Sequence, residues 1–273
     1  MHCNILYKKK YKVLKNSKYM NIAKDIMFQI GGDAKEDIIN LIDTVYNNYS
    51  AKLDITNMER MCNFNDGFNL ILDKCDEQFK QQANEYYKER NKMEEKFEQT
   101  QLDVLSELKK VFTDPNVSIH KTSSFAAKTY VLGESDIDIT ICIKSNNIPT
   151  DKMADFYKKY GEKYLIPLGY TYKDIMNLTD PRQVYQVFTK ALNGIEIEVK
   201  IRDYDAFETI LKYHEFMNEK LSDEKRKYIT YIKFLLSKPT KLPQYNKFKW
   251  IMMEFGLFNA GIYDVFGKIG LSD

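Results

Sequence analysis

Two aspartates two residues apart, Asp136 and Asp138, are the residues of this chain whose types and spacing most suggest chemistry. From Asp136 to Ile143, isoleucines alternate with polar or small residues, which predicts a β-strand with one buried face. The two carboxylates then share a face, with their Cα atoms about 6.5 Å apart. Like charges at this distance repel, and Mg²⁺ bound by carboxylate oxygens neutralises them well. The alternative is a half-solvated edge strand that carries two acids with no function.

A second acidic strand face is predicted further along the chain. Residues 195–201 alternate between β-branched residues and the charged residues Glu196, Glu198 and Lys200. Asn193-Gly194 comes directly before them and is the strongest short signal for a hairpin, so residues 184–192 are predicted to pair with this strand. If the second strand lies beside the first, three carboxylates meet on one face of a sheet.

These segments together resemble the nucleotidyltransferase superfamily, which includes DNA polymerase β, the poly(A) polymerases and the cyclic-dinucleotide synthases. Ser123-Ser124 stands where the superfamily has a Gly-Ser turn, and Ser135-Asp136-Ile137-Asp138-Ile139 matches its Ser-Asp-Ile-Asp core. Glu198 matches the third acid, with Glu196 as the alternate. The resemblance is fairly specific because three elements occur in the right order and at the right spacing.

The resemblance implies a catalytic core in which Asp136, Asp138 and Glu198 (or Glu196) bind two Mg²⁺ or Mn²⁺ ions. Two such ions roughly 4 Å apart suit in-line nucleotidyl transfer. Two departures from the superfamily pattern are a serine in place of glycine at Ser123 and a glutamate in place of the commoner aspartate at Glu198. Both departures leave room for a degenerate, inactive copy of the fold.

Four further residues are implied in binding the nucleotide. Ser123 and Ser124 match the turn that contacts the triphosphate through backbone N–H groups. Lys233 matches, in type and order, a lysine on a later helix that pairs with the same triphosphate, and Arg226 shares its helix face. For Lys233, a surface lysine beside an apolar stripe is the alternative.

Within the superfamily, the nearest likeness is to the divergent poly(A) polymerases of large DNA viruses. It implies a metal-dependent, template-independent enzyme that adds nucleotides, AMP from ATP or another NTP, to an RNA 3′ end. A processivity subunit is a further expected partner. Three alternatives share the same acids: a cyclic-dinucleotide or oligonucleotide synthase, another enzyme that transfers NMP, and an inactive scaffold of the same fold.

The elements around these residues predict an α+β fold in three regions. A small mixed sheet with helices on one side forms the catalytic core, and helical regions flank it. The predicted helices include one long helix over 76–111 and a shorter one over 153–165, and Asp33 and Ser222 are predicted N-caps. The regions are residues 1–113, 114–205 and 206–273.

The composition limits the class of protein and the cellular compartment that can be expected. The chain has 273 residues, is 44% hydrophobic and 29% charged, and so is typical of ordinary globular proteins. Its net charge of +2 does not argue for binding nucleic acid, although the Lys- and Tyr-rich residues 1–20 suit either RNA contact or a solvated terminus. Four scattered cysteines, no apolar run that could span a bilayer and no signal peptide predict a cytoplasmic protein without membrane contact.

Overall fold

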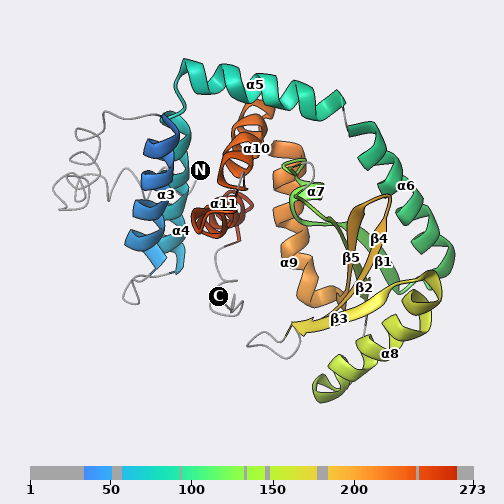
Figure 1. Cartoon of the computed structure of the whole chain (residues 1–273). Helices are drawn as coiled ribbons and strands as arrows, with labels where there is room; N and C mark the ends of the chain where they lie inside the picture. The colour runs from blue at the N-terminus through green and yellow to red at the C-terminus, as the bar shows by residue number, and fades with distance from the viewer. Residues whose placement is uncertain are drawn as a thin grey trace.

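The structure, a computed structural model, describes residues 34–50, 57–92, 94–131, 134–144, 148–176, 184–237 and 240–262. It confirms the α+β class, with helices around a five-stranded mixed sheet (Figure 1). The strands are β1 (Val117–Lys121), β2 (Ile137–Ile143), β3 (Thr171–Met176), β4 (Tyr185–Leu192) and β5 (Ile195–Asp203). The helices are α3 (Ala34–Ser50), α4 (Asn57–Asp73), α5 (Glu77–Lys92), α6 (Glu94–Val111), α7 (Ser123–Ala126), α8 (Met153–Leu165), α9 (Tyr204–Glu215), α10 (Asp223–Ser237) and α11 (Gln244–Asn259).

The strand order in the sheet is β1-β2-β5-β4-β3. β2 and β5 run parallel, and the other neighbouring pairs are antiparallel. The predicted hairpin is confirmed: β4 and β5 pair, and Asn193 and Gly194 between them have φ angles of 55° and 78°. Two positive φ angles are what a two-residue turn between twisted antiparallel strands requires. This hairpin places β5 in the sheet, where it pairs with β2.

β2 is buried on both faces, so the prediction of one buried face is wrong. Its isoleucines pack in a core that also contains residues of α6 and α8. On the other face, α9 covers part of the sheet, and the ring of Phe207 lies 5.2 Å from the guanidinium of Arg202 on β5. Helices therefore lie on both sides of the sheet rather than on one. Alternation identifies the two faces of a strand, but it does not reveal a helix that covers the polar face.

Gly161 lies where α8 packs closely against the sheet. A Cβ atom there would lie 2.3 Å from Cε2 of Phe188 and 2.8 Å from Cδ1 of Ile201, and both side chains are fully buried. We expect Gly161→Ala to lower the free energy of unfolding by about 1–3 kcal/mol through overpacking. A urea titration followed by circular dichroism measures this loss. Lys159→Ala, an exposed change on the same helix, is the control, and an equal loss in both variants would contradict the packing.

The described helices and strands form two hydrophobic cores. One core joins α3, α4 and α5 to α10 and α11, and the other joins α6 and α8 to the sheet. Asp43 on α3 accepts hydrogen bonds of 2.6 Å from both Gln244 and Lys247 on α11, which ties the two ends of the described chain together. The predicted N-terminal and C-terminal helical regions therefore share one core, and α6 belongs with the sheet.

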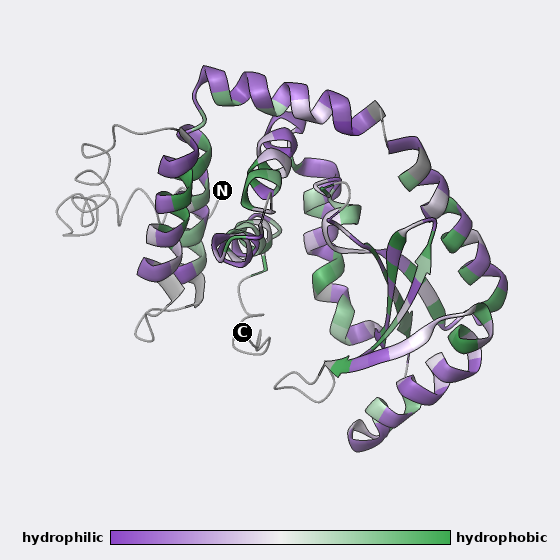
Figure 2. Ribbon diagram, in the orientation of Figure 1, coloured by the Kyte–Doolittle hydropathy of each residue, from purple (hydrophilic) through white to green (hydrophobic). Residues whose placement is uncertain are grey.

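The single long helix predicted over 76–111 is wrong, because α5 ends at Lys92 and α6 begins at Glu94. The two helices serve different cores. Tyr86 on α5 stacks on Phe234 of α10 at 4.3 Å, whereas Phe97 on α6 stacks on Tyr130 beside the sheet at 4.7 Å. Figure 2 shows the largely hydrophilic α5 passing from the helical core toward α6. Tertiary packing thus decides where the helix ends, although no Gly or Pro interrupts the sequence.

The predicted cap at Ser222 is confirmed, and the helix over 153–165 is present as α8. The backbone N–H of Lys225 donates to Oγ of Ser222 at 3.3 Å at the start of α10. A side-chain acceptor at this position satisfies one of the N–H groups that the first helical turn leaves unpaired. The predicted cap at Asp33 and the basic residues 1–20 lie outside the described residues.

Candidate functional site

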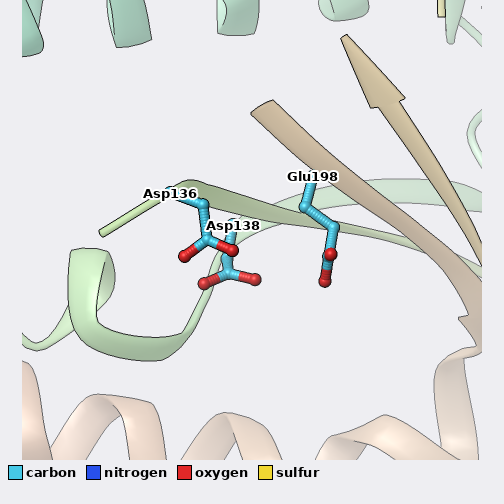
Figure 3. A group of neighbouring side chains, drawn as sticks. All are labelled: Asp136, Asp138 and Glu198. Carbon is cyan, nitrogen blue, oxygen red and sulfur yellow. The ribbon is translucent and has the colours of Figure 1, made fainter. Parts of the chain in front are cut away.

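The parallel pair of β2 and β5 brings the acidic residues together. Asp138 lies opposite Glu198 in the register of these strands, and Asp136 comes directly before β2 on the same face. One carboxylate oxygen from each of Asp136, Asp138 and Glu198 lies within 4.8 Å of the others, and the three groups gather at one place (Figure 3). We call these three residues the acidic trio. Hard oxygen ligands at this spacing suit Mg²⁺ or Mn²⁺.

Glu196, the alternate third acid, lies outside the trio. Its side chain is 54% exposed and pairs with Nζ of Lys173 at 3.1 Å. The side chain of Glu198 is only 15% exposed and extends to the same side as those of Asp138 and Asp136 (Figure 3). The structure therefore favours Glu198 over Glu196 as the acid that completes a metal site.

Two lysines partly neutralise the acidic trio. Nζ of Lys200 lies 2.7 Å from Oδ1 of Asp138 and 3.1 Å from Oε1 of Glu198. Nζ of Lys173 lies 3.2 Å from Oε2 of Glu198 while it also pairs with Glu196. Two ammonium groups thus face four carboxylates, counting Glu196, and two negative charges remain when all are ionised. This imbalance fits the binding of a divalent cation.

The pKa of Asp136 reflects the same imbalance. Burial raises the pKa of this carboxyl above its ordinary value, and the negative charges of Asp138 and Glu198 raise it further. Lys200 and a backbone hydrogen bond oppose the rise but do not cancel it. A cation bound by the trio would favour the ionised form of Asp136, because an opposite charge at contact distance stabilises a carboxylate.

The predicted serine turn lies beside the acidic strand. The N–H of Thr122, the residue before α7, donates to the backbone oxygen of Asp138 at 3.1 Å. Ser123 follows with a φ of 56°, in the left-handed region that favours glycine. This backbone angle agrees with the glycine that the superfamily pattern has at this position. Contact of Ser123 and Ser124 with a triphosphate stays a prediction.

Arg226 and Lys233 hold α10 against the loop that follows α7. The buried guanidinium of Arg226 donates to the backbone oxygens of Ala127 at 2.6 Å and Leu221 at 3.0 Å, and also to that of Asn218. Nζ of Lys233 donates to the backbone oxygen of Thr129 at 2.6 Å, and the side chain is only 1% exposed. Arg226 is therefore placed for a structural role, whereas the charge of Lys233 still interacts with Asp136 and Asp138.

Burial, with smaller contributions from the positive charges of Lys249 and Arg90, lowers the pKa of Lys233 to about 7 against the opposing effect of Asp136 and Asp138. The unfolded chain keeps the ordinary, higher value, so it binds more protons than the folded protein above about pH 7. We expect the free energy of unfolding to rise with pH from about 7 to about 10, by on the order of 1 kcal/mol per unit. Urea titrations at several pH values measure this slope. Lys233→Met should flatten it, and an unchanged slope in that variant would contradict the assignment.

Three residues on or just before α11 were not predicted from the sequence, and two of them, Tyr245 and Lys249, interact electrostatically with the acids. Lys241 and Lys249 lie 4.6 Å and 5.8 Å from the ring of Tyr245, between them in the chain. Desolvation lowers the pKa of Lys249, and Asp138 and Asp136 raise it. Burial, with smaller contributions from the negative charges of Asp136 and Glu134, raises the pKa of Tyr245 to about 12. The spacing of four residues between the three residues was a usable signal, but only the fold shows that Tyr245 and Lys249 interact electrostatically with the acids.

Comparison with known proteins does not assign a family. Neither a protein-family profile nor a curated protein sequence matches this chain. Among the described residues, no helix combines the length and the apolar character needed to cross a bilayer. Among the described cysteines, Cys75 and Cys142 are buried free thiols. The cytoplasmic location stays a prediction, and any function must be argued from the site itself.

Proposed function

We propose that this protein is a metal-dependent nucleotidyltransferase that adds nucleotides, AMP from ATP or another NTP, to the 3′ end of an RNA. The observation that carries the proposal is the acidic trio, formed where Asp138 and Glu198 face each other on parallel strands beside the Ser123-Ser124 turn. The trio supplies only oxygen ligands, retains net negative charge and sits on a rigid, buried sheet, as a two-ion site requires.

In this reaction, different residues of the chain would bind the metal ions and the triphosphate. Asp136 and Asp138 would hold both ions, and Glu198 would hold the ion nearer the attacking hydroxyl. Bound there, the ions would favour deprotonation of that hydroxyl and stabilise charge on the departing pyrophosphate. Lys249 on α11 interacts electrostatically with Asp138 and Asp136, and Lys241 lies just before this helix, over the ring of Tyr245. We assign both lysines to the triphosphate together with Ser124.

A catalytically inactive scaffold of the same fold is the second candidate. The contacts of Lys200 with Asp138 and Glu198 favour it, because a permanent ammonium group would remove the need for metal. Ser123, which has a positive φ and stands where the superfamily pattern has glycine, is a second feature that favours an inactive scaffold. These two candidates predict opposite results in one assay.

The assay combines the purified full chain with Mg²⁺ or Mn²⁺, each labelled NTP in turn and a short RNA primer, with a parallel set lacking primer. Primer extension that the Asp136→Ala/Asp138→Ala variant loses would support the proposal and identify the nucleotide. A small labelled product without primer would instead indicate a cyclic-dinucleotide or oligonucleotide synthase. No product under any condition, from protein shown to be folded by circular dichroism, would favour the inactive scaffold. Adding candidate processivity subunits to the primer reaction would test that partner.

A further inference from the structure

The contacts of Lys200 bear on how the acidic trio could bind a metal. The ammonium group lies 2.7 Å from Oδ1 of Asp138 and 3.1 Å from Oε1 of Glu198, so it bridges the two strands. Its side chain is 19% exposed and that of Asp138 only 7%. Little water screens this ion pair, which makes it stronger than a pair on the protein surface. Without another cation, Lys200 is the main partner of Asp138.

A divalent ion and this ammonium group would compete for the same two carboxylates. An ion that bridges Asp138 and Glu198 needs a lone pair from each carboxylate, and the ammonium group uses one oxygen of each. Two positive charges so close together also repel. Lys173 differs, because it contacts the other oxygen of Glu198 and its own side chain is 49% exposed.

His214 lies on α9, the helix that packs against β5, and its ring is 6.2 Å from that of Phe207 on the same helix. Its side chain is buried, and its Nδ1 atom has no hydrogen-bond partner. Burial, with smaller contributions from the positive charges of Lys200 and His120, lowers the pKa of His214 to about 3, so the ring is neutral. A neutral imidazole has one nitrogen that accepts a hydrogen bond. The other groups that interact electrostatically with Lys200 are Tyr185 on β4 and Lys249 on α11.

We propose that Lys200 is a resident counter-ion of the acidic trio, which a divalent metal must displace toward His214 in order to bind. The displacement works against metal binding and stabilises the metal-free protein. Removing the ammonium group should therefore tighten metal binding, the opposite of the effect expected for a residue that assists it. The inference rests on one part of the proposed function, namely that the trio binds metal, and not on nucleotide transfer.

The test measures Mn²⁺ binding to the purified full chain, without nucleotide, by electron paramagnetic resonance of the free ion and by calorimetry. We expect Lys200→Met and Lys200→Gln to bind Mn²⁺ about tenfold more tightly than the wild type, equivalent to about 1.4 kcal/mol. Lys200→Arg keeps the charge and should bind about as weakly as the wild type. Lys173→Met is the matched control for loss of a lysine at the rim, and its effect should be smaller.

His214→Phe keeps Lys200 but removes the acceptor toward which it would be displaced. This variant should therefore bind Mn²⁺ more weakly than the wild type. Equal or weaker binding by both folded Lys200→Met and folded Lys200→Gln would overturn the inference, as would the absence of Mn²⁺ binding from every variant. If Lys200→Met does not fold, the glutamine variant and His214→Phe still decide. Tight binding by the Lys200 variants in a protein that transfers no nucleotide would support the inference and count against the proposed function alone.

Discussion

Replacing Asp138 by asparagine should reduce nucleotide transfer by about a thousandfold or more, equivalent to roughly 4 kcal/mol of transition-state stabilisation. Asp138 is the most buried member of the acidic trio and lies opposite Glu198 in the strand register. Asparagine keeps the size of the side chain but removes the charge that would hold a metal. The rate of primer extension at saturating Mn²⁺, compared between variant and wild type, measures the loss.

Two glutamate variants make this prediction specific to the trio. Glu198→Gln should also lose most activity, whereas Glu196→Gln should keep most of it, because Glu196 is largely exposed and outside the trio. Circular dichroism of each variant checks that the loss is not one of folding. Full activity in Asp138→Asn would overturn the assignment of the metal site. A larger loss of activity in Glu196→Gln than in Glu198→Gln would show that Glu196, and not Glu198, is the third acid.

The parts of the site that alternate along strands could be predicted from the sequence. Period two placed Asp136 and Asp138 on one face, and the Asn193-Gly194 turn placed Glu198 in the same sheet. The same alternation put Lys200 on the acidic face, where the structure has it. Local rules suffice here because a strand has only two faces and because a two-residue turn requires φ angles that few residues adopt readily.

Features set by contacts between distant segments could not be predicted. No local rule shows that α9 covers the polar face of β2, or that α5 and α6 separate because they pack in different cores. Arg226 and Lys233 have helical spacing that suits a ligand, yet both donate to backbone oxygens just after α7, those of Ala127 and Thr129. The choice between these roles depends on the position of that loop, about a hundred residues earlier in the chain, and not on helix periodicity.

The shared helical core predicts the largest effect on stability. Phe68 on α4 is fully buried, and its ring lies 4.1 Å from that of Phe255 and 6.2 Å from that of Phe248, both on α11. Phe68→Ala removes this contact between segments from the two ends of the described chain and leaves a cavity. We expect the free energy of unfolding to fall by about 3–5 kcal/mol. A urea titration followed by circular dichroism measures it.

Leu102→Ala is the control, because Leu102 is 56% exposed on α6 and should change the free energy of unfolding by no more than about 0.5 kcal/mol. The loss of Phe68 should also affect the residues of the site that depend on the position of α11. Lys241, Tyr245 and Lys249 lie on or just before α11, so their position beside the acids depends on the core that Phe68 fills. Phe68→Ala should therefore weaken nucleotide binding while Mn²⁺ binding by the sheet persists. A variant as stable as Leu102→Ala would show that α4 does not hold α11 in place.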